Sequence, residues 1–192
     1  MKKILFVIPM LLFLGACAPE ASSELPPLPS SNTTSTSSDE SSSQSGPTYY
    51  HAKITRENSG LTGDDSTEAI VTNITTDEDA GVSYSFEIGA PAYQHHKFDE
   101  FVLKGSAYVK SSSSYRVERL LVDVYKGSDF AVYAGSEKGT TPLEKHQSSV
   151  APQDSADGVV YEYAIENDGF YVANGDSSRK ASFYSITVIF SI

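Results

Sequence analysis

Hydrophobic and polar residues alternate with a period of two in several short runs after residue 69. The run at 82–88 carries apolar side chains at Val82, Tyr84, Phe86 and Ile88, with serine or glutamate between them. A run at 70–74 has the same period, and the last run places Tyr184, Ile186, Val188, Phe190 and Ile192 on one side. Because successive side chains of a strand point to opposite faces, this alternation predicts strands with one buried face.

Two longer runs are apolar on both sides and are each followed by a turn signal. Residues 120–125 are apolar except at Asp123, which favours a central strand. The turn Gly127-Ser128-Asp129 and the run at 130–134 predict that this strand returns as a hairpin, and residues 159–173 predict a second hairpin. An internal repeat is the alternative, but two copies are too few for a repeat architecture. We therefore interpret them as hairpins built alike.

No stretch of residues 48–192 shows sustained helical periodicity. Turn sequences such as Asn58-Ser59-Gly60 and Asn167-Asp168-Gly169 recur between the short apolar runs. Many short strands at intervals of about 8 to 12 residues are typical of an all-β antiparallel sandwich or barrel. We predict one such domain over residues 48–192, a length that suffices for a real core.

The order of these runs, which ends on an apolar strand after Arg179-Lys180-Ala181-Ser182, resembles the jelly-roll sandwiches of the galactose-binding-like type over residues 70–192. That resemblance implies a module of the kind that accompanies secreted enzymes and surface proteins, with ligands meeting the loops at one end. Two segments here mix polar groups with a ring or a guanidinium, as sugar recognition requires. The candidate ligand-binding residues are Tyr93, His95, His96, Asn174, Asp176 and Arg179. The alternative is two unrelated solvated loops.

The first 16 residues have the composition of a secretory signal, with Lys2 and Lys3 before an apolar run at 4–14. That run is about half of the roughly 20 residues that a membrane-spanning helix needs. Leu14-Gly15-Ala16-Cys17 resembles the lipobox of bacterial lipoproteins, which implies that Cys17 is lipidated and begins the mature chain. The alternative is an ordinary cleaved signal with an incidental cysteine. Since Cys17 is the only cysteine, no intramolecular disulfide is expected.

Residues 17–47 consist of the cysteine and a stretch dominated by Ser, Thr, Pro and acidic residues. Their few apolar side chains cannot bury a face, so we expect a disordered tether. A tether of this composition would span on the order of 30 Å on average. It would lift the domain through a polymer layer, or simply provide slack.

The chain is acidic, and this bounds its partners. Its formal net charge is −11, which becomes −13 without Lys2 and Lys3. This disfavours nucleic acid and anionic lipid as direct ligands. Neutral glycans, cationic surfaces or another protein are the expected partners.

No sequence motif for catalysis is present. The chain has no G-x-S-x-G, H-E-x-x-H, P-loop or dinucleotide fingerprint. His95 and His96 are adjacent, and adjacent strand residues face opposite ways, so they are poorly placed to share a metal. We expect a protein that is not an enzyme and has no cofactor. A hydrolase with an unrecognised carboxylate pair is the third-ranked alternative.

A structural calcium ion is the one possible exception to the expectation that no cofactor is bound. Asp77-Glu78-Asp79-Ala80-Gly81 begins like an oxygen-ligand loop, with Asp77 and Asp79 as candidate ligands. The segment lacks the distal bidentate glutamate of a helical calcium loop. Asp154, Asp157 and Asp176 are competing ligands.

The twelve tyrosines, with no tryptophan beside them, supply rings with polar tips that suit binding surfaces, although tyrosine is also an ordinary strand residue. The favoured hypothesis is a lipid-anchored, extracytoplasmic β-sandwich, of the Gram-positive cell-surface type, that binds a carbohydrate or an envelope protein. The alternative is a structural or interaction lipoprotein that recruits a membrane or envelope partner. An aromatic platform flanked by Asn, Asp or Arg would favour sugar, and a flat apolar patch would favour protein.

Overall fold

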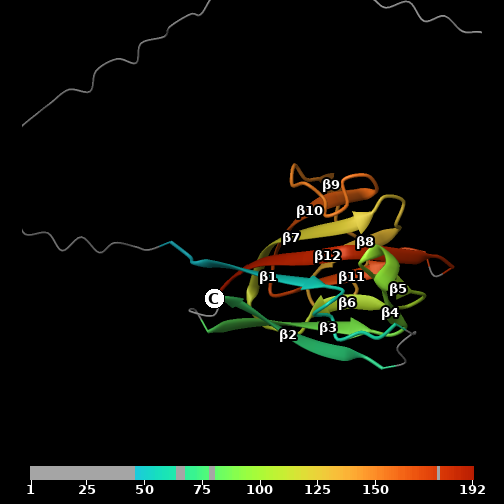
Figure 1. Cartoon of the computed structure of the whole chain (residues 1–192). Helices are drawn as coiled ribbons and strands as arrows, with labels where there is room; N and C mark the ends of the chain where they lie inside the picture. The colour runs from blue at the N-terminus through green and yellow to red at the C-terminus, as the bar shows by residue number, and fades with distance from the viewer. Residues whose placement is uncertain (1–45, 64–67, 78–80, 177) are drawn as a thin grey trace, which may run out of the picture. The chain divides into compact units, whose positions relative to one another are not determined.

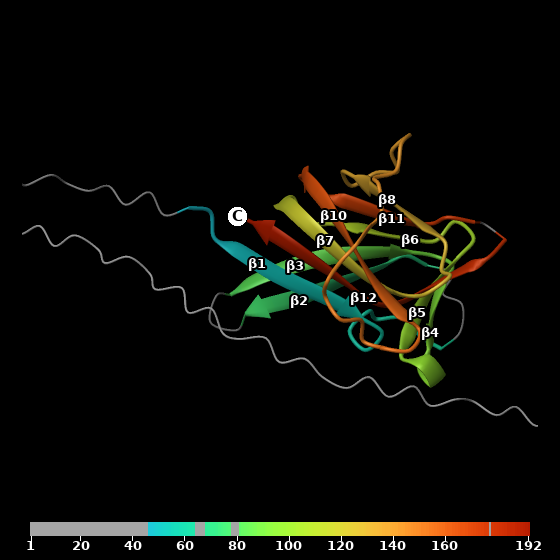
Figure 2. The same cartoon turned by 90° about the horizontal axis from the view of Figure 1, so that it is seen from above.

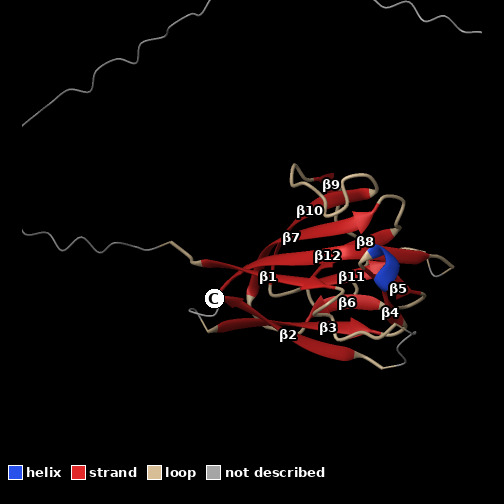
Figure 3. Cartoon of the chain, in the orientation of Figure 1, coloured by secondary structure: helices blue, strands red, loops and turns tan. Residues whose placement is uncertain are grey.

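The computed structural model describes residues 46–63, 68–77, 81–176 and 178–192, which form two antiparallel β-sheets packed face to face (Figures 1 and 2). The only helical element in these ranges is one short 3₁₀ turn, η1 (His96–Phe98), drawn in blue in Figure 3. The predicted all-β antiparallel sandwich is confirmed. Within the described part of the chain, no helix has the length and apolar character needed to cross a membrane.

The seven-stranded sheet consists of β1 (Tyr49–Thr55), β4 (Ala92–His95), β5 (Glu100–Lys104), β7 (Arg116–Tyr125), β9 (His146–Gln147), β10 (Gly158–Asn167) and β12 (Lys180–Ser191). Its order is β4-β5-β12-β7-β10-β9, and β1 pairs with the second half of β12. The five-stranded sheet has the order β2-β3-β6-β11-β8. It consists of β2 (Ile70–Asp77), β3 (Val82–Gly89), β6 (Tyr108–Ser111), β8 (Phe130–Ala134) and β11 (Phe170–Asn174).

The strands from β5 onward pair in a nested way. The first pairs with the last (β5 with β12), the second with the last but one (β6 with β11), and β7 pairs with β10. Successive pairs alternate between the two sheets. This is the connectivity of a long hairpin rolled up on itself, as in a jelly roll. The predicted jelly-roll-like order is therefore also confirmed.

The core lies between the sheets and is built from the alternating apolar positions. In β3 the predicted face is confirmed, since Tyr84, Phe86 and Ile88 are buried and belong to the core cluster. Phe101 of β5 and Phe183 of β12 stack there with ring centroids 5.4 Å apart. Burying each such side chain contributes about 1.5–3 kcal/mol.

Both predicted hairpins are wrong. β7 lies in the seven-stranded sheet whereas β8 lies in the five-stranded sheet, and β10 and β11 are divided in the same way. Each turn is therefore an arch that carries the chain from one sheet to the other. A polar turn between two apolar runs suits an arch as well as a hairpin, because in both cases each run has an apolar face toward the core.

The predicted shared face of the last strand needs a second correction. Ile186, Val188 and Phe190 belong to the core cluster, whereas Tyr184 is buried outside that cluster. The pairing of β12 with β7 shifts register between Phe183 and Ser185, so a β-bulge reverses the alternation there. Ile192 follows the end of β12 and is exposed.

Candidate functional site

The outer face of the seven-stranded sheet is defined by the residues between the core positions of its central strands. On β7 the core residues are Leu120, Val122 and Val124. The intervening residues pair with outward positions of β12: Arg119 with Ile189, Leu121 with Thr187, and Asp123 with Ser185. These three pairs therefore follow one another along the outer face.

Three cavities lie in a row over these positions. The first, the Arg119 cavity, has a volume of about 480 Å³ and lies beside the start of β1. The second, the Asp123 cavity, measures about 220 Å³, and the third, the aromatic cleft, about 250 Å³. Arg119, Asp123 and Tyr125 line them in that order. At roughly 3.4 Å per residue, the row from Arg119 to Tyr125 is about 20 Å long.

The exposed apolar side chains gather along this row. Six large hydrophobic residues are exposed in the described ranges, and four of them line the three cavities. These four are Tyr49 in the Arg119 cavity, Val150 in the Asp123 cavity, and Phe98 and Tyr125 in the aromatic cleft. Single exposed apolar residues are ordinary, but their concentration in adjoining hollows makes this face the candidate site.

The aromatic cleft combines rings with carboxylates. It is lined by Phe98, Tyr125, Tyr184, Asp154 and Asp157, and the first two are 50% and 43% exposed. Phe98 comes from η1, Tyr125 ends β7, and Tyr184 comes from the bulge in β12. The fold thus brings three distant segments to one hollow.

The pKa values of two polar groups of the cleft, Asp154 and Tyr184, are shifted by their surroundings. The backbone N–H groups of Ala156 and Asp157 donate to Asp154 Oδ1 and hold the pKa of Asp154 below its usual value. Tyr184 donates its hydroxyl to Asp154 Oδ2 at 3.4 Å, and burial raises the pKa of Tyr184. Asp157 pairs with Lys126 at 2.8 Å. At neutral pH the cleft therefore offers the Asp154 carboxylate as an acceptor beside the neutral phenol of Tyr184.

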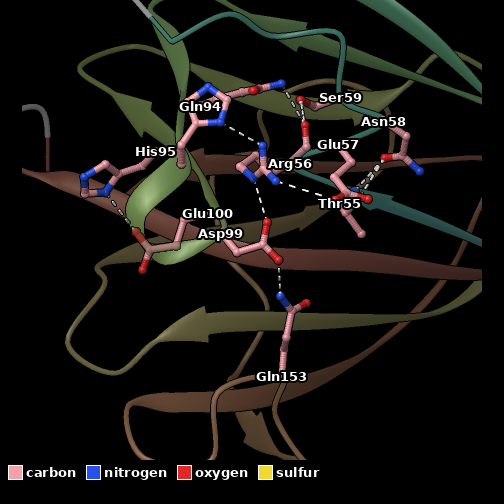
Figure 4. A network of polar contacts seen from close by, with 11 residues as sticks. Thr55, Arg56, Glu57, Asn58, Ser59, Gln94, His95, Asp99, Glu100 and Gln153 are labelled. Carbon is pink, nitrogen blue, oxygen red and sulfur yellow. Dashed lines mark hydrogen bonds and ion pairs between the residues drawn. The ribbon is translucent and has the colours of Figure 1, made fainter.

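A polar network fixes the rim of the cavity row (Figure 4). Arg56 Nε donates to Asp99 Oδ1 at 2.6 Å, and Gln153 Nε2 donates to Asp99 Oδ2 at 2.9 Å. Asp99 follows η1 directly and has a positive φ of 56°. Gln94 Nε2 donates to the carbonyl of Arg56 at 2.9 Å. The network thus joins the end of β1, η1 and the loop at 148–157 around the outer face.

A hydrogen bond links one of the two predicted binding segments to the residue that follows the other. Tyr93 on β4 accepts a 2.7 Å hydrogen bond from Lys180, directly after the 174–179 turn. Asn174 is buried, and its Nδ2 donates to three backbone carbonyls, including those of Asp176 and Arg179. Asn174 therefore shapes the turn, whereas Arg179 is exposed.

The two predicted histidines make their contacts with other residues. His95 Nδ1 is 3.4 Å from Glu100 Oε2, and the His95 ring meets Phe98 edge-on at 4.8 Å, which places it beside the aromatic cleft. His96 Nδ1 accepts a 2.9 Å hydrogen bond from Arg56, within the rim network. That these six residues bind a ligand stays a prediction.

The calcium prediction stays a prediction. Asp77 is the last residue of β2, and Asp79 lies outside the described residues. In the ranges that the structure covers, no three His, Cys, Asp or Glu side chains form a group that could hold a metal ion. Of the competing carboxylates, Asp154 and Asp176 accept hydrogen bonds from their own turns, from Ala156 and Ser178 respectively.

No protein-family model matches this chain, and no curated protein matches it at a significant level. The fold and the cavity row define the class: an all-β jelly-roll-like sandwich whose larger sheet bears a row of open, partly aromatic hollows. Its function has to be inferred from the chemistry of that face.

Proposed function

We propose that this protein is a lipid-anchored, extracytoplasmic module that binds a carbohydrate in the aromatic cleft without catalysis. The observation that carries the proposal is the pairing of two exposed rings, Phe98 and Tyr125, with the Asp154 and Asp157 carboxylates in one hollow. The apolar face of a sugar ring stacks on an aromatic ring, and its hydroxyl groups donate to carboxylates. Tyr184, within the same cleft, adds a further polar tip.

The electrostatics of the cleft favour binding over hydrolysis. A glycosidase that acts through two carboxyl groups needs one that stays protonated, with a raised pKa, as the general acid. In the cleft the pKa of Asp154 is lowered instead, by the amides of Ala156 and Asp157. Asp157 is held by Lys126 at 2.8 Å. Asp154 is therefore suited to accept hydrogen bonds and not to donate a proton.

Docking of an envelope protein is the alternative function. A protein partner favours a broad, flat apolar patch. Here the exposed side chains of Phe98, Tyr125, Val150 and Tyr49 line hollows, which suits a slender ligand better. A structural lipoprotein that recruits an envelope partner through another face stays a weaker candidate.

The location is proposed from the sequence. Lipidation of Cys17 would anchor the chain to the membrane, and residues 18–47 would place the domain among the polymers of the cell surface, of the Gram-positive type. The acidic net charge suits a neutral glycan and disfavours an anionic polymer.

A glycan and envelope-polymer binding screen tests the function. The mature chain with Cys17→Ser should bind at least one neutral glycan. Phe98→Ala and Tyr125→Ala should each weaken that binding about tenfold, which corresponds to ~1.4 kcal/mol of lost stacking. Val71→Ala is the matched control, because Val71 is equally apolar and 61% exposed on the other sheet.

Two results would contradict the proposal. One is full affinity in the Phe98→Ala/Tyr125→Ala double variant, and the other is a screen in which no glycan binds. If Tyr93→Ala and Arg179→Ala reduce affinity while the cleft variants do not, the glycan site lies instead at the turn predicted from the sequence.

A further inference from the structure

The Asp123 cavity lies next to the aromatic cleft on the same two strands. Its wall includes Asp123 of β7, Lys53 of β1 and the hydroxyl residues Ser185 and Thr187 of β12. Val150, Leu121 and Val160 add an apolar side. The cavity therefore offers one negative group, one positive group and an apolar surface within about 220 Å³.

The carboxylate of Asp123 is only half satisfied. Asp123 is 7% exposed, and its Oδ2 accepts a 2.7 Å hydrogen bond from the backbone N–H of Gln153. Its other oxygen, Oδ1, is buried with no hydrogen-bond partner among the described residues. A buried acceptor without a donor is costly, so a donor brought by a ligand would be strongly favoured there.

Lys53 supplies the complementary group. It is exposed, lines the same cavity, and carries a charge that acts on Asp123. Burial raises the pKa of Asp123, while the Gln153 amide and the Lys53 charge oppose that rise. The cavity can therefore meet a ligand donor at Asp123 and a ligand acceptor at Lys53.

These two groups together disfavour a ligand moiety that carries a single charge. An ammonium group that approaches Asp123 would also meet the positive charge of Lys53, and a carboxylate that approaches Lys53 would meet Asp123 within an acidic protein. A neutral moiety with one donor, one acceptor and a small apolar end satisfies all three parts of the wall. A secondary amide that ends in a methyl group has this composition.

We propose that the Asp123 cavity binds the acetamido group of an N-acetylated amino sugar, an inference that rests on the proposed glycan-binding function. The amide N–H donates to Asp123 Oδ1, and the amide carbonyl accepts from Lys53 Nζ. The methyl group packs against Val150 and Val160. Satisfaction of Asp123 Oδ1 makes the N-acetyl group the main determinant of specificity.

The neighbouring cleft indicates how the rest of such a ligand lies. Asp123 and Tyr125 are two residues apart on one face of β7, a separation of about 7 Å. That distance is on the order of one sugar unit. One unit places its acetamido group in the Asp123 cavity while the next stacks on Phe98 and Tyr125, so the ligand is a linear glycan that runs along β7 and β12.

Calorimetric titration of the mature Cys17→Ser chain tests this inference with three tetrasaccharides of the same β-1,4 linkage. The probes are the oligomers of N-acetylglucosamine, of glucosamine and of glucose. We expect the N-acetylated oligomer to bind at least tenfold more tightly than the other two. Asp123→Asn keeps an acceptor for Gln153 but presents an amide N–H₂ in place of Oδ1, so it should remove this preference.

Lys53→Met provides a second variant that does not disturb the buried carboxylate. It should reduce affinity for the N-acetylated oligomer and leave affinity for the glucose oligomer unchanged. Lys138→Met is the matched control, because Lys138 is an exposed lysine outside the cavity row and should have no effect.

The failures of the two proposals can be told apart. If the glucose and N-acetylated oligomers bind equally and Phe98→Ala weakens both, glycan binding stands and the acetamido site is overturned. Tighter binding of the glucosamine oligomer also overturns it, because Asp123 then selects an ammonium group. If none of the three binds, the acetamido site fails, and glycan binding itself fails only when the whole screen is negative.

Discussion

Tyr184 donates its hydroxyl to Asp154 Oδ2 from the outer side of β12, although its neighbour in the chain, Phe183, lies in the core. The cause is the bulge in β12. Phe183 and Ser185 pair with consecutive residues of β7, which leaves Tyr184 without a partner there. A β-bulge re-aims the side chains that follow it. This one places Tyr184 in the wall of the aromatic cleft, outside the core cluster, where its side chain is still buried.

The bulge fixes which residues of β12 tolerate a charge. Ile186→Asp or Val188→Asp would bury an unpaired carboxylate in the core, and each should cost several kcal/mol of a typical total of about 5–15. Thr187→Asp lies on the outer face and should cost much less. Urea unfolding measures the difference. Equal losses at 187 and 188 would show that the register is wrong.

Gln153 is expected to hold the rim of the cavity row. Gln153→Ala removes the side-chain hydrogen bond to Asp99 but keeps the backbone N–H that bonds Asp123. We expect a stability loss of only about 0.5–1.5 kcal/mol, but faster amide hydrogen exchange in residues 153–157. Ser155→Ala, at an exposed position of the same loop, is the control. Unchanged exchange in Gln153→Ala would mean that the loop does not depend on this link.

Much of the fold was accessible from the sequence. Period-two alternation predicted the buried face of β3, and the apolar run around Asp123 predicted a strand that indeed lies between β12 and β10. The turn sequences predicted where strands end but not which strands pair with one another. After β7 the chain can either pair with β7 or cross to the other sheet. The outcome depends on the pairing of β8 with β11, which no local sequence pattern specifies.

Less of the candidate site was accessible. Local polarity predicted Tyr93 and His95, which do not line the aromatic cleft, whereas Phe98 and Tyr125 come together only through the sandwich, from segments that are far apart in sequence. Asp123 did leave a signal, because it is the one charged residue in an otherwise apolar strand. A charged residue in an apolar strand indicates either a face exposed to solvent or a buried group with a structural or functional role.

Gly89 is required by the ring packed on it. A Cβ atom at this position would lie 2.1 Å from Cε1 of Tyr108, so Gly89→Ala should displace that ring and cost about 1–3 kcal/mol. Gly46→Ala should have no such effect, because nothing lies within 4 Å of the added atom. Thermal unfolding would compare them. If the clash is the cause, adding Tyr108→Ala should recover part of the loss; strictly additive effects would rule it out.

The anchor can be tested without reference to the domain. Cys17→Ala should abolish labelling of the protein by fatty acid and should release it to the medium or leave an unprocessed precursor. The mature chain should be cut by protease first between residues 18 and 47. Labelling that persists in Cys17→Ala would exclude the lipoprotein hypothesis.

The raised pKa values of two tyrosines, Tyr84 and Tyr108, predict that the free energy of unfolding falls at high pH. Burial raises the pKa of Tyr84 to about 12, and Tyr84 belongs to the core, where its hydroxyl meets that of Ser111. In the unfolded chain the phenol titrates near pH 10. Because the folded state keeps the proton more tightly, this contribution to stability is complete below about pH 10 and is lost as the pH rises toward 12.

Tyr108 acts in the same direction. Its hydroxyl donates a 2.6 Å hydrogen bond to Glu87, which is the main reason that its pKa is raised to about 12. Urea unfolding between about pH 8 and pH 11 should therefore show falling stability above pH 10. Tyr84→Phe and Tyr108→Phe should each flatten that fall, since phenylalanine has no proton to lose. Tyr49→Phe, at the exposed start of β1, should leave it unchanged; an equal flattening there would assign the effect to general charge repulsion.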